Sequence, residues 1–437
     1  MMRFMLLAIA FSLATPTLSQ GRTWKIEVGG SGDAPTIQAG IDSAAVGDTV
    51  LVSPGTYFEN ISFKGKDLSL VGERGPHFTI LDGSKEENTV VLFAEHETRA
   101  CLLEGFTITG GSGTAAFGSP RGGGITCPYA SPTIRGNVIK NNTVIRENGG
   151  SGGGIRVGEV PVKRIPSPLI ENNLFEGNVA SVVGGALCLQ HTSAIVRRNK
   201  FYRNKILKGD GGAIFQQQNT PHEVIIEDNE FWENEANDHG GAVHIDHIGP
   251  GAGPTLFRGN LVIRNAAYGL EGGDSGSGGG VFVFTDWQAS NQGVYIQNNT
   301  IVFNGGGGGR TGCSGGGLVI RHGREVVVEN NIIANNYDCG LICRDSNNME
   351  LGTNLIWGNS EGNFGNGLAE CPDEWLEVSV IEDPLFCNPQ ADVFSLATNS
   401  PAIVNGVVMG ALPAFGCGPI TGIEPTSWGK IKRSFGP

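Results

Sequence analysis

A pair of asparagines five residues apart recurs along the chain, and this repeat constrains the fold more than any other feature. Successive copies are separated by 23 to 39 residues. Internal repeats with a period in this range are typical of solenoids, in which each unit stacks on the next. The eight pairs are Asn137/Asn142, Asn173/Asn178, Asn199/Asn204, Asn229/Asn234, Asn260/Asn265, Asn299/Asn304, Asn331/Asn336 and Asn354/Asn359.

Each repeat unit also contains short apolar runs that suit β-strands. One run follows a double glycine, as in GGGIRV and GGAIFQ, a second precedes the first asparagine, and a third lies between the two asparagines. The runs are too short for helices and lack helical periodicity. The pattern therefore predicts an all-β, single-stranded parallel β-helix with three short strands per turn.

The asparagines have a structural explanation in such a coil. A sharp corner between the second and third strands demands a left-handed backbone, which asparagine tolerates. The side-chain amide both donates and accepts hydrogen bonds, so stacked asparagines can bond to each other from turn to turn. We interpret them as a structural ladder rather than a catalytic row.

Two repeat units carry opposite charges at matching positions, RRNKFYRN at 197–204 and EDNEFWEN at 227–234. Equivalent positions of successive turns are neighbours about 4.8 Å apart, where opposite charges attract. Arg264 of the following copy falls beside Glu233 on its other side. The expected neighbours are Arg197 and Glu227, Arg198 and Asp228, Lys200 and Glu230, Arg203 and Glu233, Phe201 and Phe231, and Tyr202 and Trp232.

The 437 residues, of which 39% are hydrophobic, show no long linker and are expected to form one solenoid rather than several domains. In PTIQAGIDSAA, Ile37, Ile41, Ala44 and Ala45 predict a short helix over the open end of the coil. The expected organisation is a signal peptide at 1–20, an N-terminal cap at 21–48, the β-helix at 49–360, an irregular closing module at 361–420 and a basic tail at 421–437.

The first residues predict export, because Arg3 precedes an apolar run that is too short to cross a bilayer. No later segment is apolar enough for a membrane span. Nine cysteines fit an oxidising compartment, and their odd number predicts one free thiol besides disulfides. We expect a secreted or cell-surface protein, including the periplasm and outer membrane as locations, and a monomer.

A formal net charge of −13 argues against nucleic acid as a partner. It also disfavours tight binding of an acidic polysaccharide unless a local basic patch or a cation intervenes.

The stretch TIQAGIDSAAVGDTVLVSPGTYFENISFKGKDLSLVGE resembles the opening of exported right-handed parallel β-helix proteins of the pectate-lyase-like superfamily. The later GGAL/FEGN, GGAI/FYRN and GGAV/FWEN pairs are similar to the GGA(I/L/V) and FxxN repeats of polymorphic outer-membrane proteins. The resemblance covers roughly residues 34–420 and implies a right-handed coil. Catalytic signatures of the enzyme branches are missing; Arg164 and Pro166 match part of an RxPxxR motif, but Leu169 replaces its second arginine.

The glycine-led strands place polar and aromatic residues in register on their outward side. Because strand residues alternate inward and outward, one outward column is Gln190, Gln217, Asp246, Phe284, Arg321 and Arg344. A second is Arg156, Cys188, Phe215, His244, Phe282 and Val319. Aromatic rings stack on sugars, and amides, carboxylates and arginines bind hydroxyl and carboxyl groups. The predicted substrate-binding residues are Gln190, Gln217, His244, Asp246, Phe284, Trp287, Arg321 and Arg344.

Catalysis is left open by the sequence. A lyase needs a base and a positive charge or calcium, and Arg321, Arg344 or His244 could supply the base or the positive charge. Across both reaction types, the catalytic candidates are His244, Asp246 and Arg321. Asp210 and Asp238, one turn apart ahead of the double glycines, could bind calcium; alternatively, they only form turns. A hydrolase would need a second carboxylate near Asp246, from Asp238 or Asp274.

The predicted function is binding, with cleavage open, of a polysaccharide or cell-surface glycan along one face of the solenoid. A cleaving protein would be a polysaccharide lyase or glycoside hydrolase. The alternative is a non-catalytic adhesin or envelope scaffold, in which the outward residues are ordinary solvent-facing side chains.

Overall fold

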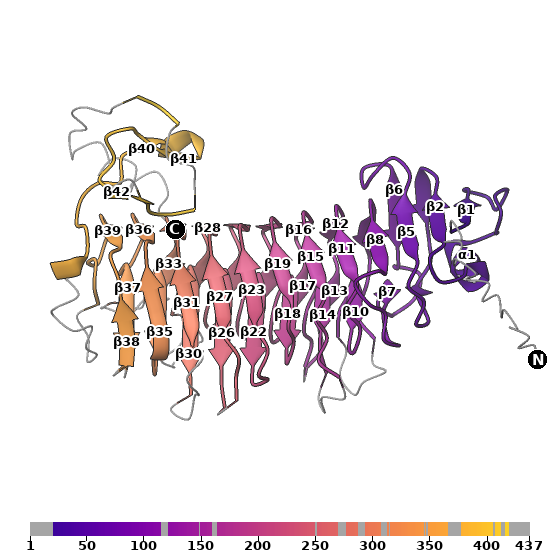
Figure 1. Cartoon of the computed structure of the whole chain (residues 1–437), viewed down its shortest axis with the longest axis horizontal. Helices are drawn as coiled ribbons and strands as arrows, with labels where there is room; N and C mark the ends of the chain where they lie inside the picture. Colours follow the sequence, from indigo (N-terminus) through magenta and orange to yellow (C-terminus); the bar gives the residue numbers. More distant parts are fainter. Residues whose placement is uncertain are drawn as a thin grey trace, which may run out of the picture.

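The computed structural model shows a parallel β-helix whose turns succeed one another along the long axis of the molecule (Figure 1). The structure describes residues 21–114, 121–147, 149–159, 164–249, 251–269, 277–286, 293–306, 313, 315–344, 346, 348–365, 377–404, 407–411 and 416–418. The predicted all-β coil of parallel strands is confirmed.

Three long parallel sheets form the sides of the coil. The twelve-stranded sheet contains β1 (Thr23–Ile26), β2 (Thr49–Val52), β5 (Ser69–Gly72), β8 (Leu102–Glu104), β11 (Thr133–Arg135), β15 (Leu169–Glu171), β19 (Ile195–Arg197), β23 (Val224–Glu227), β27 (Thr255–Arg258), β31 (Val294–Gln297), β35 (Arg324–Glu329) and β38 (Asn348–Leu351). The eleven-stranded sheet contains β3 (Gly55–Tyr57), β6 (Thr79–Asp82), β9 (Thr107–Thr109), β12 (Val138–Lys140), β16 (Leu174–Glu176), β20 (Lys200–Tyr202), β24 (Glu230–Trp232), β28 (Leu261–Ile263), β32 (Thr300–Val302), β36 (Ile332–Ala334) and β39 (Leu355–Trp357).

The third long sheet is built from the glycine-led strands, and we call it the glycine-led sheet. It contains β4 (Ile61–Ser62), β7 (Val91–Leu92), β10 (Ile125–Cys127), β14 (Ile155–Val157), β18 (Leu187–Gln190), β22 (Ile214–Gln218), β26 (Val243–His247), β30 (Val281–Thr285), β34 (Leu318–Arg321) and β37 (Leu341–Arg344). Beyond the three predicted strands per turn, a fourth sheet has two-residue strands. These are β13 (Thr143–Val144), β17 (Val179–Ala180), β21 (Lys205–Ile206), β25 (Glu235–Ala236), β29 (Ala266–Ala267) and β33 (Gly305–Gly306).

The interior of the coil is filled mainly by stacked apolar side chains. Phe175, Phe201 and Phe231 are fully buried, with ring centroids 4.6 and 4.9 Å apart and nearly parallel planes. The predicted stacking of Phe201 on Phe231 is confirmed, and Tyr202 is the register partner of Trp232. Like residues therefore meet like residues from turn to turn.

The asparagine ladder is confirmed, and all of its side chains are buried. Asn204 is representative: its Nδ2 donates to Oδ1 of Asn234 at 2.9 Å, and its Oδ1 accepts from the backbone N and Nδ2 of Asn178, each at 3.0 Å. The left-handed corner residue, however, is the one that precedes the asparagine, for example Arg203 at φ 52°. The expectation that the ladder asparagines themselves adopt this conformation is wrong.

The charge-inverted segments are in the predicted register, and two of the expected ion pairs form. Lys200 Nζ lies 3.1 Å from Glu230 Oε1, and Arg203 Nε lies 2.7 Å from Glu233 Oε2. For the corner residues Arg198 and Asp228, the structure gives the same left-handed conformation but no ion pair.

Two arginines form ion pairs with partners other than those predicted. Arg197 is the Cα partner of Glu227, yet its guanidinium lies 2.8 Å from Glu171 on the other neighbouring turn. Glu227 is bound instead by Arg258 at 2.8 Å, so charges still alternate along this face. Arg264 pairs with Asp392 at 2.6 Å rather than with Glu233.

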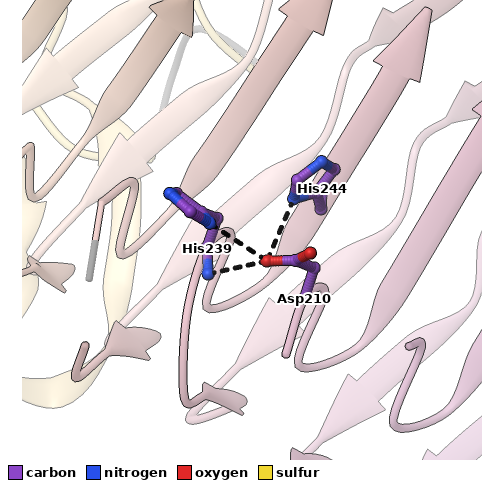
Figure 2. A group of neighbouring side chains, drawn as sticks. All are labelled: Asp210, His239 and His244. Atoms are coloured by element: carbon purple, nitrogen blue, oxygen red, sulfur yellow. Dashed lines mark hydrogen bonds and ion pairs between the residues drawn. The ribbon is translucent and has the colours of Figure 1, made fainter. Parts of the chain in front are cut away.

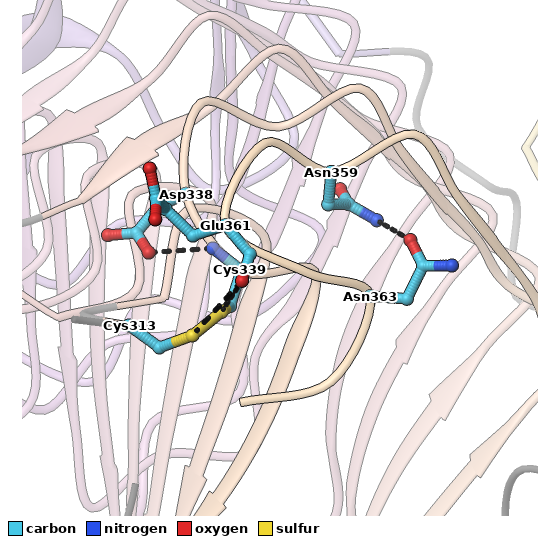
Figure 3. The surroundings of a disulfide bond; sticks show 6 residues. All are labelled: Cys313, Asp338, Cys339, Asn359, Glu361 and Asn363. Atoms are coloured by element: carbon cyan, nitrogen blue, oxygen red, sulfur yellow. Dashed lines mark hydrogen bonds between the residues drawn. A yellow bond between two sulfur atoms is a disulfide. The ribbon is translucent and has the colours of Figure 1, made fainter. Parts of the chain in front are cut away.

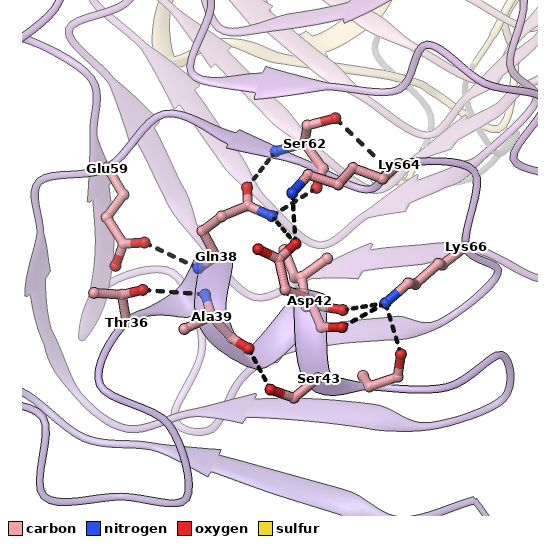
Figure 4. Close-up of polar contacts among 11 residues, drawn as sticks. Thr36, Gln38, Ala39, Asp42, Ser43, Glu59, Ser62, Lys64 and Lys66 are labelled. Atoms are coloured by element: carbon pink, nitrogen blue, oxygen red, sulfur yellow. Dashed lines mark hydrogen bonds and ion pairs between the residues drawn. The ribbon is translucent and has the colours of Figure 1, made fainter.

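The N-terminal end is covered by α1 (Ile37–Ser43), as predicted. Thr36 Oγ1 accepts from the Ala39 N–H, and the Glu59 carboxylate accepts from the Gln38 N–H (Figure 4). The same carboxylate also accepts from the Ile37 N–H. Lys66 Nζ donates to three carbonyls at the other end of the helix (Figure 4). Both ends of this short helix are thus satisfied by groups of suitable charge.

The buried face of α1 is formed by Ile37, Gly40 and Ile41. Ala44, just past the helix, is buried as expected. Ala45 is exposed, because the helix has already ended, so its predicted place on the buried face is wrong.

A C-terminal module lies against one side of the last turns (Figure 1). It contains β40 (Phe386–Asn388), η1 (Pro389–Ala391), β41 (Val393–Leu396), β42 (Ile403–Val404) and β43 (Val407–Val408). Phe386, Phe394 and Met409 form an apolar cluster with the outward residues Leu261 and Ile263 of β28. The module therefore buries an outer face of the eleven-stranded sheet.

Two disulfides join described cysteines, Cys313 to Cys339 (Figure 3) and Cys387 to Cys417. Cys343 is disulfide-bonded as well. Three thiols, those of Cys101, Cys127 and Cys188, are free and buried, so the expectation of a single free thiol is wrong. In the part of the chain that the structure describes, no helix is long and apolar enough to cross a membrane. The predicted signal peptide and basic tail lie outside the described residues.

Candidate functional site

The first predicted column on the glycine-led sheet exists, and we call it the outward row. Its members are register partners in successive turns and are half-buried: Gln190, Gln217, Asp246, Phe284, Arg321 and Arg344. Trp287, also predicted to bind substrate, lies outside the described residues. The outward row is thus a line of polar, aromatic and basic side chains about 4.8 Å apart.

Side-chain contacts divide the outward row into two parts. At one end, Gln190 accepts a hydrogen bond from Arg156, and Gln217 Nε2 donates to Asp246 Oδ2 at 3.2 Å. At the other end, Phe284 makes an edge contact with His322, with ring centroids 5.4 Å apart. Arg321 and Arg344 then follow in adjacent turns.

The second predicted column is in register but does not face solvent. His244 and Phe282 are only 5% and 3% exposed. Residues ahead of the double glycines cover this column: the His239 ring lies 4.4 Å from the Phe282 ring. The expectation of a solvent-facing His244 is therefore wrong, because strand alternation does not reveal what covers an outward side chain.

Asp210, His239 and His244 form a compact histidine–aspartate cluster where these residues cover the second column (Figure 2). Asp210 Oδ1 accepts from the backbone N of His239 at 3.0 Å and lies 3.1 Å from His239 Nδ1. The same oxygen lies 3.5 Å from His244 Nδ1. Asp238 contributes a second carboxylate, with Oδ1 3.0 Å from His239 Nδ1. Two imidazoles and two carboxylates from two adjacent turns thus meet here.

Three members of the cluster, His244, His239 and Asp210, have shifted pKa values. Burial lowers the pKa of His244, but Asp210 and Asp246 outweigh this effect and raise it to about 10. Burial likewise opposes the raised pKa of His239, which results from the neighbouring carboxylates of Asp210 and Asp238. Burial would raise the pKa of Asp210, but the histidines hold it well below its usual range. The His244 imidazole is accordingly protonated at neutral pH.

Asp246 links the cluster to the outward row. Its Oδ1 lies 3.3 Å from His244 Nε2, and its Oδ2 accepts from Gln217. Of the three catalytic candidates, His244 and Asp246 are therefore in contact. Arg321 stands two turns from Asp246, with Phe284 between them. The structure does not bring the three together around one point.

The proposed calcium residues Asp210 and Asp238 lie in adjacent turns, but the residue in register with Asp210 is His239. Sequence reasoning missed His239, although GDGG at 209–212 and DHGG at 238–241 align it with Asp210 once the glycines are superimposed. Two nitrogen ligands beside one carboxylate are a poor set for calcium, which prefers oxygen.

A comparison with protein families agrees with the fold. The family described as right-handed β-helix region matches residues 81–278, and the chain is an all-β right-handed parallel β-helix. Among solved structures, the A-module of mannuronan C-5 epimerase AlgE6 from Azotobacter vinelandii matches with 16% identity, covering 79% of this chain and 93% of that chain, at a TM-score of 0.35. A likeness at that level supports no conclusion about activity. A comparison with curated proteins found no match.

Proposed function

We propose that the protein is exported and binds polysaccharide along the outward row. The observation that carries the proposal is the register itself, which aligns hydrogen-bonding, aromatic and cationic side chains in one half-buried line. A linear polymer can contact several such side chains at once. The disulfides agree with an oxidising compartment, as export requires.

The basic end of the outward row favours a polysaccharide that carries carboxylate or other anionic groups. Arg321 and Arg344 are directly opposite each other in adjacent turns, where like charges repel. An anion between them relieves this repulsion, and arginine binds carboxylates through two parallel hydrogen bonds. These two side chains also provide the local basic patch that a chain of net charge −13 needs to bind an acidic polymer.

The proposed activity is binding rather than cleavage. His244 is too deeply buried beneath the outward row to touch a polymer that lies along it. Asp246 and Arg321 do reach the surface, but they are separated by the position of Phe284.

Binding is tested on an array of neutral and acidic polysaccharides, followed by calorimetric titration of any ligand found. Arg321→Ala removes a charge-assisted contact and is expected to weaken binding about ten-fold or more. Phe284→Ala should weaken it as well through lost ring stacking. The matched control is Arg324→Ala, because Arg324 is exposed in β35 on the neighbouring sheet and should not matter. Failure to bind any glycan, or equal affinities of the two arginine variants, would overturn the proposal.

A further inference from the structure

We propose that Asp210, His239 and His244 form a binding site for a divalent transition metal of the zinc class. This proposal does not depend on the proposed binding of polysaccharide. Their ligand atoms, one from each residue, all lie within 4.8 Å of one another. Two imidazoles and a carboxylate are ligands that zinc prefers, whereas calcium and magnesium prefer oxygen alone.

The distances between ligand atoms suit a small tetrahedral ion. Bond lengths of about 2.1 Å to nitrogen and oxygen separate neighbouring tetrahedral ligands by about 3.4 Å. Asp210 Oδ1 lies 3.1 Å from His239 Nδ1 and 3.5 Å from His244 Nδ1. Binding of an ion therefore requires small shifts of side chains rather than rearrangement of the coil.

His244 provides independent support, because its Nδ1 is buried and makes no hydrogen bond with acceptable geometry. This atom points towards Asp210 (Figure 2). Asp238 Oδ1 is also buried without a hydrogen bond of acceptable geometry, next to His239. Asp238 lies outside the group of three whose ligand atoms are all within 4.8 Å of one another, so its role is to balance the charge of the ion.

The surroundings of His244 resemble the outer shell that orients metal-binding imidazoles. Its second ring nitrogen, Nε2, faces the carboxylate of Asp246 at 3.3 Å, and Gln217 holds that carboxylate from the other side. Such carboxylate–histidine pairs fix the orientation of a ligand and raise its basicity. The side chains of Asp210 and His239 are 25% and 18% exposed, so an ion can reach them from solvent.

Titration of the tag-free, metal-stripped full chain with Zn²⁺ tests the site, with calorimetry for stoichiometry and Co²⁺ absorption for coordination. One equivalent of Zn²⁺ and a tetrahedral Co²⁺ spectrum are expected, with no comparable uptake of Ca²⁺. Loss of an outer-shell partner typically weakens metal binding about 10- to 100-fold, and this is the effect expected for Asp246→Asn. His239→Gln removes a ligand and should weaken Zn²⁺ binding by at least as much.

His222→Gln is the matched control, since His222 is exposed and outside the cluster. Circular dichroism of each variant checks that the coil is intact. His239 is substituted rather than His244, because replacing the deeply buried His244 could disturb the fold. The proposal is overturned if the wild-type chain takes up no Zn²⁺, or if His239→Gln binds it as tightly as His222→Gln does. Either result would leave the cluster as histidines paired with carboxylates.

Discussion

At the scale of single residues, Gln216 is a polar side chain inside the coil that its described neighbours do not satisfy. Gln216 is fully buried and lies in register between Leu189 and Ile245. Neither its amide nitrogen nor its amide oxygen has a hydrogen-bond partner among the described residues. A buried amide in this state costs free energy that an apolar residue of similar size would not.

Gln216→Leu is therefore expected to raise the free energy of unfolding by about 1–3 kcal/mol, measured by urea denaturation. Gln217→Leu is a close control, because it makes the same chemical change one residue away on the half-exposed outward row. It should not raise stability, because it removes the hydrogen bond that the Gln217 amide donates to Asp246. A loss of stability in Gln216→Leu would show that its amide is satisfied in solution.

At the scale of elements, the asparagine ladders and the ion pairs contribute differently to the corners between sheets. The ladder amides are buried and bond to the turns on both sides. The ion pairs, such as Lys200 with Glu230, lie at the surface, where their side chains are 62% and 37% exposed. Surface pairs of this kind are screened by solvent and stabilise little.

Asn204→Ala should therefore destabilise the coil by roughly 2–6 kcal/mol, because it leaves the backbone N and Nδ2 of Asn178 without their acceptor. Lys200→Ala in the same turn should cost no more than about 1 kcal/mol. Denaturant unfolding gives both values, and hydrogen exchange should show faster opening around residues 173–234 in Asn204→Ala alone. Similar losses in the two variants would contradict this assignment of stability to the ladder.

At the scale of the whole molecule, the repeat makes the register of the strands predictable from the sequence. It does not predict which partner a side chain binds or which residues bury it. Register gives Arg197 an acidic neighbour on each side, and only the structure shows that it binds Glu171. The outward row follows from strand alternation, but the burial of His244 depends on residues of adjacent turns. The sequence does indicate where the C-terminal module docks. Strand β28 (LVI) is apolar on both faces, whereas β20 (KFY) carries a charged residue on its outer face.

Stacking in register brings together side chains from different turns and so creates both proposed sites. The most direct test of this stacking is oxidation of Gln217→Cys/Asp246→Cys, with Gln217→Cys/Phe284→Cys as the control. Burial raises the pKa of the native free thiols of Cys101, Cys127 and Cys188, which keeps them unreactive.

Adjacent turns place Cα atoms about 4.8 Å apart, within reach of a disulfide, whereas two turns separate them by about 9.6 Å, beyond its reach. Mass spectrometry of the digested, oxidised chains should detect the 217–246 cross-link and no 217–284 cross-link. Detection of the 217–284 cross-link without the 217–246 cross-link would contradict the register.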